Sequence, residues 1–147
     1  VDLNADQRED LIVASGIDDI MVSFRSIAPN RVEKFGEVPA GTGPAGVACP
    51  DLNEDGRPDL VVSNSFEGTI SVYFGGARGF EFVGSLITGS GLDSGPLGVA
   101  TGDFNHDGAE DVVVANQLED TITVFFGDGT GAFPVVRSFE VDSLPTA

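Results

Sequence analysis

The sequence predicts an all-β protein in which three similar units, each of about four short antiparallel strands, follow one another. Three observations lead to this prediction. A nine-residue acidic motif occurs three times, beginning at Asp2, Asp51 and Asp103. A short apolar run and then an alternating apolar run follow each copy, as expected of strands. No segment has the sustained apolar period of a helix, and units of roughly 50 residues with four strands each are typical of β-propeller blades.

The strands are expected in the same order in every unit, with the acidic motif between the first and second strands. The third strand alternates most clearly, because Ile70, Val72 and Phe74 share one face. We align Ile70 with Ile20 and Ile122 of the other units. First strands are expected at 44–49 and 96–101, and second strands at 11–14, 60–63 and 112–115. Third strands are expected at 20–24, 70–74 and 122–126, and fourth strands near 32–38, 80–88 and 133–141.

The repeats divide the chain into three units with unmatched ends. Residues 1–50 form blade one without its own first strand, residues 51–102 form blade two, and residues 103–147 form blade three with the start of the next first strand. Three blades cannot close a ring, and an open end exposes an unpaired strand edge. We expect either self-association, in which two copies supply six blades and three supply nine, or further blades of a longer chain. The sequence begins at Val1, with neither an initiator Met nor a recognisable signal peptide. We therefore also expect that this chain is a processed or excised segment.

The composition favours a packed, acidic domain. The chain of 147 residues carries 24 acidic and 7 basic residues, a formal net charge of −17. This balance argues against nucleic acid and against electrostatic docking on anionic membranes, since both require clustered Lys and Arg. Hydrophobic residues make up 41% of the chain, which argues against disorder, yet no apolar run is long enough for a membrane-spanning helix. The single cysteine, Cys49, excludes an intrachain disulfide framework and a multi-cysteine zinc site.

The acidic motif suits a hard cation. Side-chain oxygens at its first, third and fifth positions converge when the chain curls tightly, the seventh position offers a backbone carbonyl, and the ninth-position Asp can close the site with two carboxylate oxygens. A ligand set made only of oxygen favours Ca²⁺ over zinc or copper. We therefore expect up to three Ca²⁺ ions, one per blade, with a structural role in holding the loop between the first and second strands.

Two other interpretations of the motif compete with this one. An EF-hand requires Glu at the twelfth position and helical flanks, but Val62 and Val114 occupy that position and strands flank the loops. Asx turns in solvated hairpins use the same residue types, but three copies in phase are hard to explain by turn chemistry alone. The first copy has Gln7 in place of the sixth-position Gly. Because a left-handed backbone costs a non-Gly residue about 1–2 kcal/mol, we expect the first site to be the weakest.

Further motifs extend the similarity between units beyond the acidic loop. Val-x-Phe-Gly occurs at 72–75 and 124–127, and a Gly-rich turn then leads to Phe80 and Phe133. With these motifs, the chain resembles the FG-GAP/VCBS-type calcium-binding repeat family, and is similar to the blades of integrin α-subunits and of some lectins. The resemblance implies a β-propeller in an extracellular or periplasmic protein, with a role in adhesion or in binding glycan or protein.

The resemblance also implies which residues bind the metal. Each set comprises the side chains at positions one, three, five and nine and the carbonyl at position seven. The implied ligands are Asp2, Asn4, Asp6, Arg8 and Asp10 in the first loop, Asp51, Asn53, Asp55, Arg57 and Asp59 in the second, and Asp103, Asn105, Asp107, Ala109 and Asp111 in the third.

Several other residues have simpler explanations than function. Gly41–Gly46 matches G-x-G-x-x-G, but Pro44 interrupts it and a strand follows, so we expect a loop between blades. His106 lies at the fourth loop position, which should point away from the ion. Cys49 is expected to be a buried structural thiol. The acidic pairs Asp18-Asp19 and Glu119-Asp120 are expected in solvated turns.

Three functional hypotheses follow from these patterns. The favoured one is a non-catalytic calcium-binding module for extracellular recognition or adhesion, with a glycan or protein ligand. The alternative is a self-assembling structural propeller fragment without its own ligand. A polysaccharide-active enzyme built on a propeller is the least favoured, since the sequence contains no unique pair of acid and base residues outside the repeats.

Overall fold

The computed structural model describes residues 1–146 as three antiparallel β-sheets, and no helix occurs in this part of the chain. The first sheet has three strands and the other two have four, as the sequence predicts. The strands are β1 (Leu11–Ser15), β2 (Ile20–Ala28) and β3 (Arg31–Pro39) in the first sheet, β4 (Pro44–Ala48), β5 (Leu60–Asn64), β6 (Thr69–Gly76) and β7 (Gly79–Ile87) in the second, and β8 (Pro96–Gly102), β9 (Asp111–Asn116), β10 (Thr121–Phe126) and β11 (Val135–Glu140) in the third.

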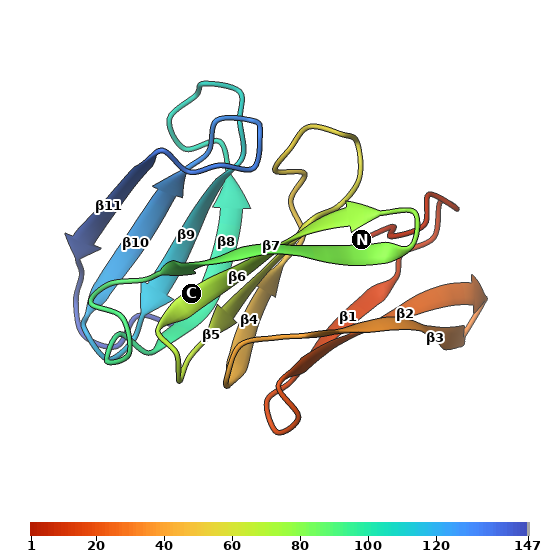
Figure 1. Ribbon diagram of the computed structural model, residues 1–147, viewed down its shortest axis with the longest axis horizontal. Helices are drawn as coiled ribbons and strands as arrows, with labels where there is room; N and C mark the ends of the chain where they lie inside the picture. The colour runs from red at the N-terminus through yellow and green to blue at the C-terminus, as the bar shows by residue number, and fades with distance from the viewer. Residues whose placement is uncertain (147) are drawn as a thin grey trace.

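The sheets follow one another like the blades of a propeller, and within residues 1–146 they do not close into a ring (Figure 1). Strand order within each sheet follows chain order, so every connection is a simple hairpin. The strands β4 and β8 contact each other, and β4 also contacts β1. The strands β3, β7 and β11 form the opposite edges of their sheets. No helix able to span a membrane is found in the described part of the chain.

Each sequence repeat begins at its acidic loop, but each of the second and third sheets begins one strand earlier. Strand β4 precedes the second acidic loop but pairs with β5, which follows it. Strand β8 pairs with β9 across the third loop in the same way. Each acidic loop of the second and third sheets therefore joins the first two strands of one sheet, and the first loop leads into β1.

Strand register corrects one detail of the repeat alignment. Leu11 pairs with Phe24, and the equivalent Leu60 pairs with Tyr73. This register makes Met21, not Ile20, the counterpart of Ile70. The correction matters because a shift of one residue moves a side chain to the opposite face of a sheet. Met21 is only 1% exposed, as an inward-facing residue should be.

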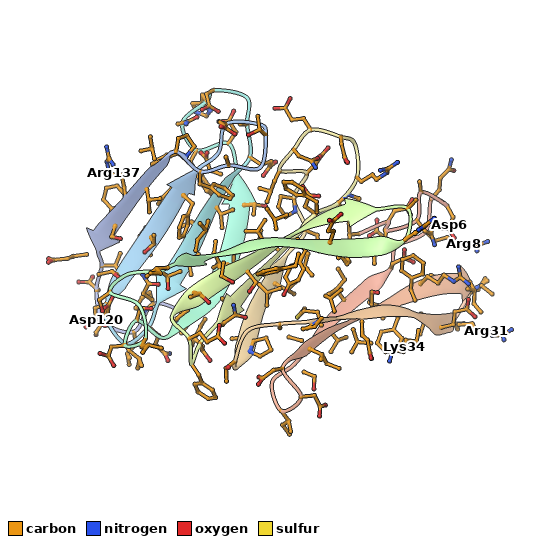
Figure 2. All side chains as sticks on the ribbon, in the orientation of Figure 1. Asp6, Arg8, Arg31, Lys34, Asp120 and Arg137 are labelled. Atoms are coloured by element: carbon orange, nitrogen blue, oxygen red, sulfur yellow. The ribbon has the colours of Figure 1, made fainter. Side chains whose placement is uncertain are left out.

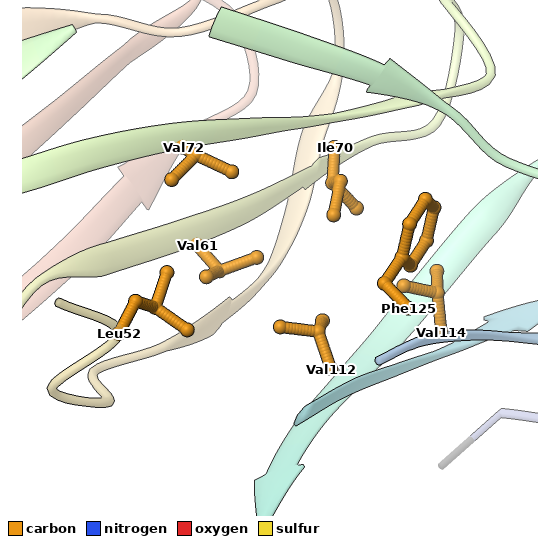
Figure 3. Close-up of a cluster of buried hydrophobic side chains, with 7 residues drawn as sticks. All are labelled: Leu52, Val61, Ile70, Val72, Val112, Val114 and Phe125. Carbon is orange, nitrogen blue, oxygen red and sulfur yellow. The ribbon is translucent and has the colours of Figure 1, made fainter. Parts of the chain in front are cut away.

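The core consists of two apolar clusters, one at each junction between sheets. At the first junction Met21 packs with Leu60, Val62 and Tyr73. At the second junction alternate residues of β5 and β6 pack against the third sheet (Figure 3); the buried residues are Leu52, Val61, Ile70, Val72, Val112, Val114 and Phe125. Burial of each such side chain stabilises the fold by about 1.5–3 kcal/mol, against about 1 kcal/mol for a typical hydrogen bond. Each buried side chain at a junction therefore contributes more to stability than one loop hydrogen bond does.

The chain has only seven basic side chains, and those labelled in Figure 2 lie toward its two ends. Arg8, Arg31 and Lys34 lie toward the far end of the first sheet, while Arg137 lies on β11 at the opposite end of the molecule (Figure 2). Lys34 pairs with Glu37 on the same strand. The side chains of β11 are exposed along its whole length.

Candidate metal centres

The three acidic loops share one backbone conformation. In each loop the residues at the fourth and sixth positions have positive φ. The φ angles are 59°, 56° and 62° for the fourth-position residues Ala5, Glu54 and His106, and 68°, 80° and 97° for the sixth-position residues Gln7, Gly56 and Gly108. The sequence predicted the left-handed sixth position from its glycines. The left-handed fourth position was not predicted, because Ala, Glu and His share no conformational preference that would reveal it.

Hydrogen bonds inside the second loop explain its tight curl. The carboxylate of Asp51 accepts the N–H groups of Asp55 at 3.0 Å and Gly56 at 2.8 Å. Asn53 Oδ1 accepts the Asp55 N–H at 3.1 Å, and Asp55 Oδ1 accepts the Arg57 N–H at 2.9 Å. The third loop repeats this pattern with Asp103, Asn105 and Asp107 as the acceptors. The first, third and fifth side chains are thus held on the inside of the curl.

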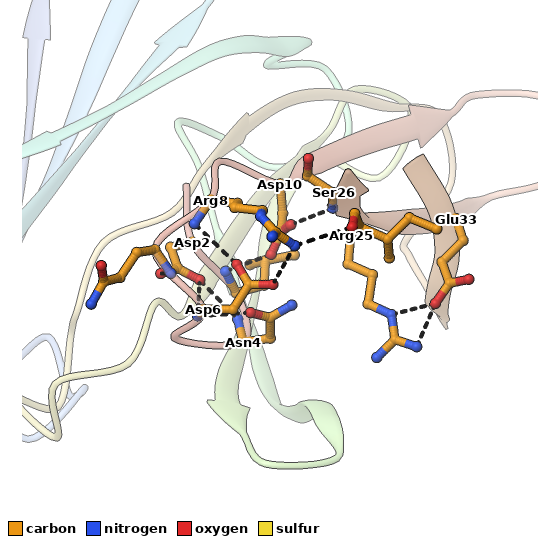
Figure 4. Close-up of polar contacts among 11 residues, drawn as sticks. Asp2, Asn4, Asp6, Arg8, Asp10, Arg25, Ser26 and Glu33 are labelled. Carbon is orange, nitrogen blue, oxygen red and sulfur yellow. Dashed lines mark hydrogen bonds and ion pairs between the residues drawn. The ribbon is translucent and has the colours of Figure 1, made fainter. Parts of the chain in front are cut away.

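The first loop has the same hydrogen bonds although it lacks the glycine (Figure 4). Asp2 accepts the N–H groups of Asp6 at 3.2 Å and Gln7 at 2.7 Å, and Asn4 Oδ1 accepts the Asp6 N–H at 2.9 Å. Asp6 Oδ1 accepts the Arg8 N–H at 3.0 Å. Gln7 therefore adopts the strained left-handed backbone that glycine adopts without cost.

The ninth-position Asp is the buried anchor of each loop. Asp10, Asp59 and Asp111 are 4%, 0% and 0% exposed. One oxygen of each carboxylate accepts the N–H of the second loop residue, at 2.8–2.9 Å. The other oxygen accepts an N–H near the C-terminal end of β2, β6 or β10 in the same sheet. The anchor therefore ties the loop to a hairpin sixteen residues further along the chain.

Two glycines permit this anchoring, and the sequence analysis assigned them only to a turn. Gly75 and Gly127 donate their N–H groups to Asp59 Oδ1 at 2.8 Å and Asp111 Oδ1 at 2.9 Å. A Cβ atom on Gly75 would lie 2.0 Å from the Pro58 carbonyl oxygen, and one on Gly127 would lie 2.2 Å from that of Glu110. The signal that could have found them is the Gly of the repeated Val-x-Phe-Gly motif. In the first sheet, Ser26 is the donor in the same place.

Electrostatics differ between the anchor and the exposed loop residues. Burial raises the pKa of Asp59; the N–H bonds from Gly75 and Leu52 oppose this rise, and repulsion from Asp55 and Asp51 adds to it. That repulsion shows that the loop concentrates negative charge.

Two carboxylates nearer the surface of the loops, Asp107 and Asp2, have the opposite shift in pKa. At Asp107, the N–H bond from Ala109 and the amide of Asn105 lower the pKa. At Asp2, partial desolvation acts to raise the pKa, but several loop N–H bonds outweigh it and lower the pKa.

The donor chemistry fits a hard cation, and the cluster is not preformed. Over residues 1–146, no three carboxylate, His or Cys side chains gather closely enough to make a metal cluster on their own. Carboxylates without a cation between them repel one another, and in each loop they accept backbone N–H groups. Each such oxygen keeps a second lone pair, and the available donors are all oxygens, which suits Ca²⁺ and not zinc. Metal binding by these loops stays a prediction.

Other residues singled out in the sequence lie outside this arrangement. His106 is exposed at the left-handed fourth position of the third loop. Cys49 is half-buried and packs beside the Leu60 cluster. Residues 40–43 connect β3 to β4 without a helix, as expected of a loop between blades.

A groove lies between the first and second sheets, away from the acidic loops. Its volume is about 440 Å³. Three aromatic side chains lie along it, and Tyr73 and Phe82 have ring centroids 5.3 Å apart. The lining residues are Val38, Pro39, Ala40, Gly41, Glu67, Ser71, Tyr73, Phe80, Phe82 and Ser85. The groove thus combines the exposed ring of Phe82 with hydroxyl groups and one carboxylate.

The repeated four-stranded sheets and their anchored acidic loops define a module of the β-propeller type. Family comparisons agree with this class. The FG-GAP-like repeat matches residues 2–62 and 51–114, and the FG-GAP repeat matches residues 95–136. The chain therefore belongs to the FG-GAP repeat family. A search of curated proteins found no match.

Proposed function

We propose that the protein is a non-catalytic recognition module whose three acidic loops each bind one Ca²⁺ ion. The observation that carries this proposal is the identity of the loops. The same side-chain oxygens, the same two left-handed positions and the same buried anchor recur in all three copies. Turn formation alone does not require three carboxylates in each loop, since carboxylates held close together repel one another.

Calcium has a structural role in this proposal. Each loop holds three carboxylates, and a divalent ion reduces their mutual repulsion. An ion that binds only the folded loop stabilises the fold, by about 2.7 kcal/mol at one hundred times its dissociation constant. Because Asp59 and Asp111 link their loops to Gly75 and Gly127, the ion would stiffen the whole end of each sheet.

The recognition surface is the groove between the first two sheets. Aromatic rings such as Phe82, which is 58% exposed, can stack on the apolar face of a sugar or hold an apolar side chain of a protein. Ser85 and Glu67 supply polar contacts beside them. Glu67 is the only acid among the lining residues, whereas glycoside hydrolysis requires two, which supports a binding role. Extracellular or periplasmic placement, where calcium is available, suits this function.

A calcium titration with matched variants tests the metal proposal. Calorimetry should give three sites per chain for the natural sequence and two for Asp55→Asn or Asp107→Asn. Glu54→Gln is the matched control: it removes the same charge from the second loop at a position outside the ligand set, so it should keep three sites. An EDTA-treated sample should melt at a lower temperature than a calcium-loaded one. Absence of calcium-dependent heat and of any melting shift would refute the proposal.

A further inference from the structure

The two ends of the row of sheets carry apolar faces on which no other sheet of the described chain packs. On the first sheet, Leu11 and Val13 are 53% and 48% exposed. By strand register they correspond to Leu60 and Val62, which are completely buried at the first junction. On the third sheet, Val113 and Ile122 line an apolar hollow of about 530 Å³.

The internal junctions show how such faces fit together. At the second junction, Val61 and Ile70 of the second sheet pack against Val112 and Val114 of the third. The register makes Val113 and Ile122 the third-sheet counterparts of Val61 and Ile70. It likewise makes Leu11 and Val13 the first-sheet counterparts of Val112 and Val114. The two uncovered faces are therefore the two complementary halves of one further junction.

The loop that leaves the third sheet has the same geometry as the loops at both internal junctions. Gly43, Gly95 and Leu144 each precede a proline and have φ angles of 67°, 57° and 59°. Asp19 Oδ1 accepts the Gly43 N–H at 2.9 Å, and Asp120 Oδ1 accepts the Leu144 N–H at 2.8 Å. Asp120 is at the lower left of Figure 2, at the outer end of the third sheet.

At each internal junction, the first turn of the following sheet binds this loop. Ser65 and Phe66 donate their N–H groups to the carbonyls of Gly43 at 2.9 Å and Thr42 at 3.2 Å. Glu67 accepts the N–H and the hydroxyl of Thr42, both at 2.9 Å. At the second junction the same main-chain bonds join Gln117 and Leu118 to Gly95 and Ser94, both at 3.1 Å. There Glu119 accepts the N–H of Ser90, four residues before the counterpart of Thr42.

The counterparts of these groups at the two ends of the molecule are exposed. The turn of the first sheet that matches 65–67 consists of Gly16, Ile17 and Asp18, and Ile17 is 96% exposed. The loop that matches 42–43 contains Ser143 and Leu144, and Leu144 is 62% exposed. Phe66 and Leu118 lie against Gly43 and Gly95 at the internal junctions, so Ile17 corresponds to a side chain that packs on this loop.

We infer that a second copy of this chain docks head to tail on the first. The first sheet of one copy packs on the third sheet of the other. The N–H groups of Gly16 and Ile17 bind the carbonyls of Leu144 and Ser143 of the partner copy, and Asp18 accepts its Ser143 N–H and hydroxyl. Pro44 and Pro96 pair with Asn64 and Asn116 at the internal junctions.

By the same register, Pro145 of the partner copy pairs with Ser15 on the free edge of β1. This interface is heterologous, so it forms a ring where the rotation between copies closes and a filament where it does not.

Solution mass measured by light scattering tests this docking, with variants on each face. Ile17→Glu alters the first-sheet face, called the head. Ile122→Glu alters the third-sheet face, called the tail, and so does Leu144→Glu, at a position that is 62% exposed. Ile87→Glu is the control, because Ile87 is 68% exposed on β7, outside both faces. At about 100 μM the natural chain and the control should associate. The head and tail variants should be monomers at this concentration, because their dissociation constants should be raised about tenfold or more.

Mixing the variants distinguishes head-to-tail docking from other contacts. A mixture of Ile17→Glu and Leu144→Glu retains one intact junction, so it should form a dimer and nothing larger. A natural chain that stays monomeric at every concentration would overturn the inference. So would self-association of Ile17→Glu alone at natural strength, which would show that two tails or two other surfaces meet.

Discussion

Asp59 accepts the N–H of Gly75 at 2.8 Å, and through this bond the second acidic loop is attached to the far hairpin of its own sheet. Asp111 and Gly127 repeat the relationship at 2.9 Å in the third sheet. The anchor carboxylate therefore serves two purposes. It supports the sheet without any metal, and it places a negative charge at the base of the proposed calcium loop.

Asp59→Asn should destabilise the protein even in EDTA. The buried carboxylate accepts two N–H groups, from Leu52 and Gly75. The Asn amide offers only one oxygen, so one of these two backbone N–H groups would face the amide NH₂ instead of an acceptor. The lost hydrogen bond should lower the free energy of unfolding by about 1–3 kcal/mol. Urea denaturation in EDTA measures the loss, and Asp93→Asn, at an exposed position, should leave the midpoint unchanged. Equal midpoints for the two variants would contradict the anchoring role.

Gly75→Ala should also destabilise the fold, because its Cβ would lie 2.0 Å from the Pro58 carbonyl oxygen. The backbone must shift to relieve that overlap, and such overpacking costs about 1–3 kcal/mol. Gly84→Ala is the matched control, since nothing lies within 4 Å of its added Cβ. Thermal melting of both variants should show a lower melting temperature for Gly75→Ala only.

Gln7→Gly should stabilise the first loop. Gln7 has a φ of 68°, and relief of this strain should more than offset the flexibility that glycine adds to the unfolded chain. We expect a gain of about 0.5–1 kcal/mol by urea denaturation. The reverse change in the second loop, Gly56→Gln, should cost about 1–2 kcal/mol. A loss of stability in Gln7→Gly would show that the first loop is not strained.

Phe82→Ala should weaken ligand binding at the groove without lowering the melting temperature, because Phe82 is 58% exposed. Removal of a stacking ring reduces affinity by about 1–3 kcal/mol. The measurement is a glycan array and a screen of extracellular proteins, both with calcium present, followed by titration of any ligand found. Phe139→Ala, at a 50% exposed ring on β11, is the control and should bind as the natural chain does.

Cys49 should react slowly with thiol reagents in the folded protein. Burial raises the pKa of its thiol, so at pH 8 a smaller fraction is thiolate than in the unfolded chain. Since the thiolate is the reacting species, the rate should be lower in the folded protein than in urea. Reaction followed by absorbance in buffer and in urea measures the ratio, and equal rates would contradict the shift.

Local sequence patterns were sufficient to predict where the strands and the acidic loops lie in the chain. Alternation in 70–74 and the repeat of Asp51 and Asp103 are short-range features, so they predicted strand, loop and family without knowledge of packing. Alignment of Ile20 with Ile70 failed because apolar residues at Ile20 and Met21 fit the pattern equally well. Only pairing with β1 decides which of the two faces inward.

By itself, the sequence determined an all-β chain of repeated blades, the order of their strands and the oxygen-rich chemistry of the three loops. These properties follow from the alternation of side chains and from the spacing of residues within one unit. The tertiary structure alone decided that Asp59 is an anchor for Gly75, that Met21 fills a junction and that Leu11 and Ile122 belong to complementary uncovered faces. Each of these depends on contacts between residues far apart in the chain, and strand register and the stacking of sheets establish such contacts.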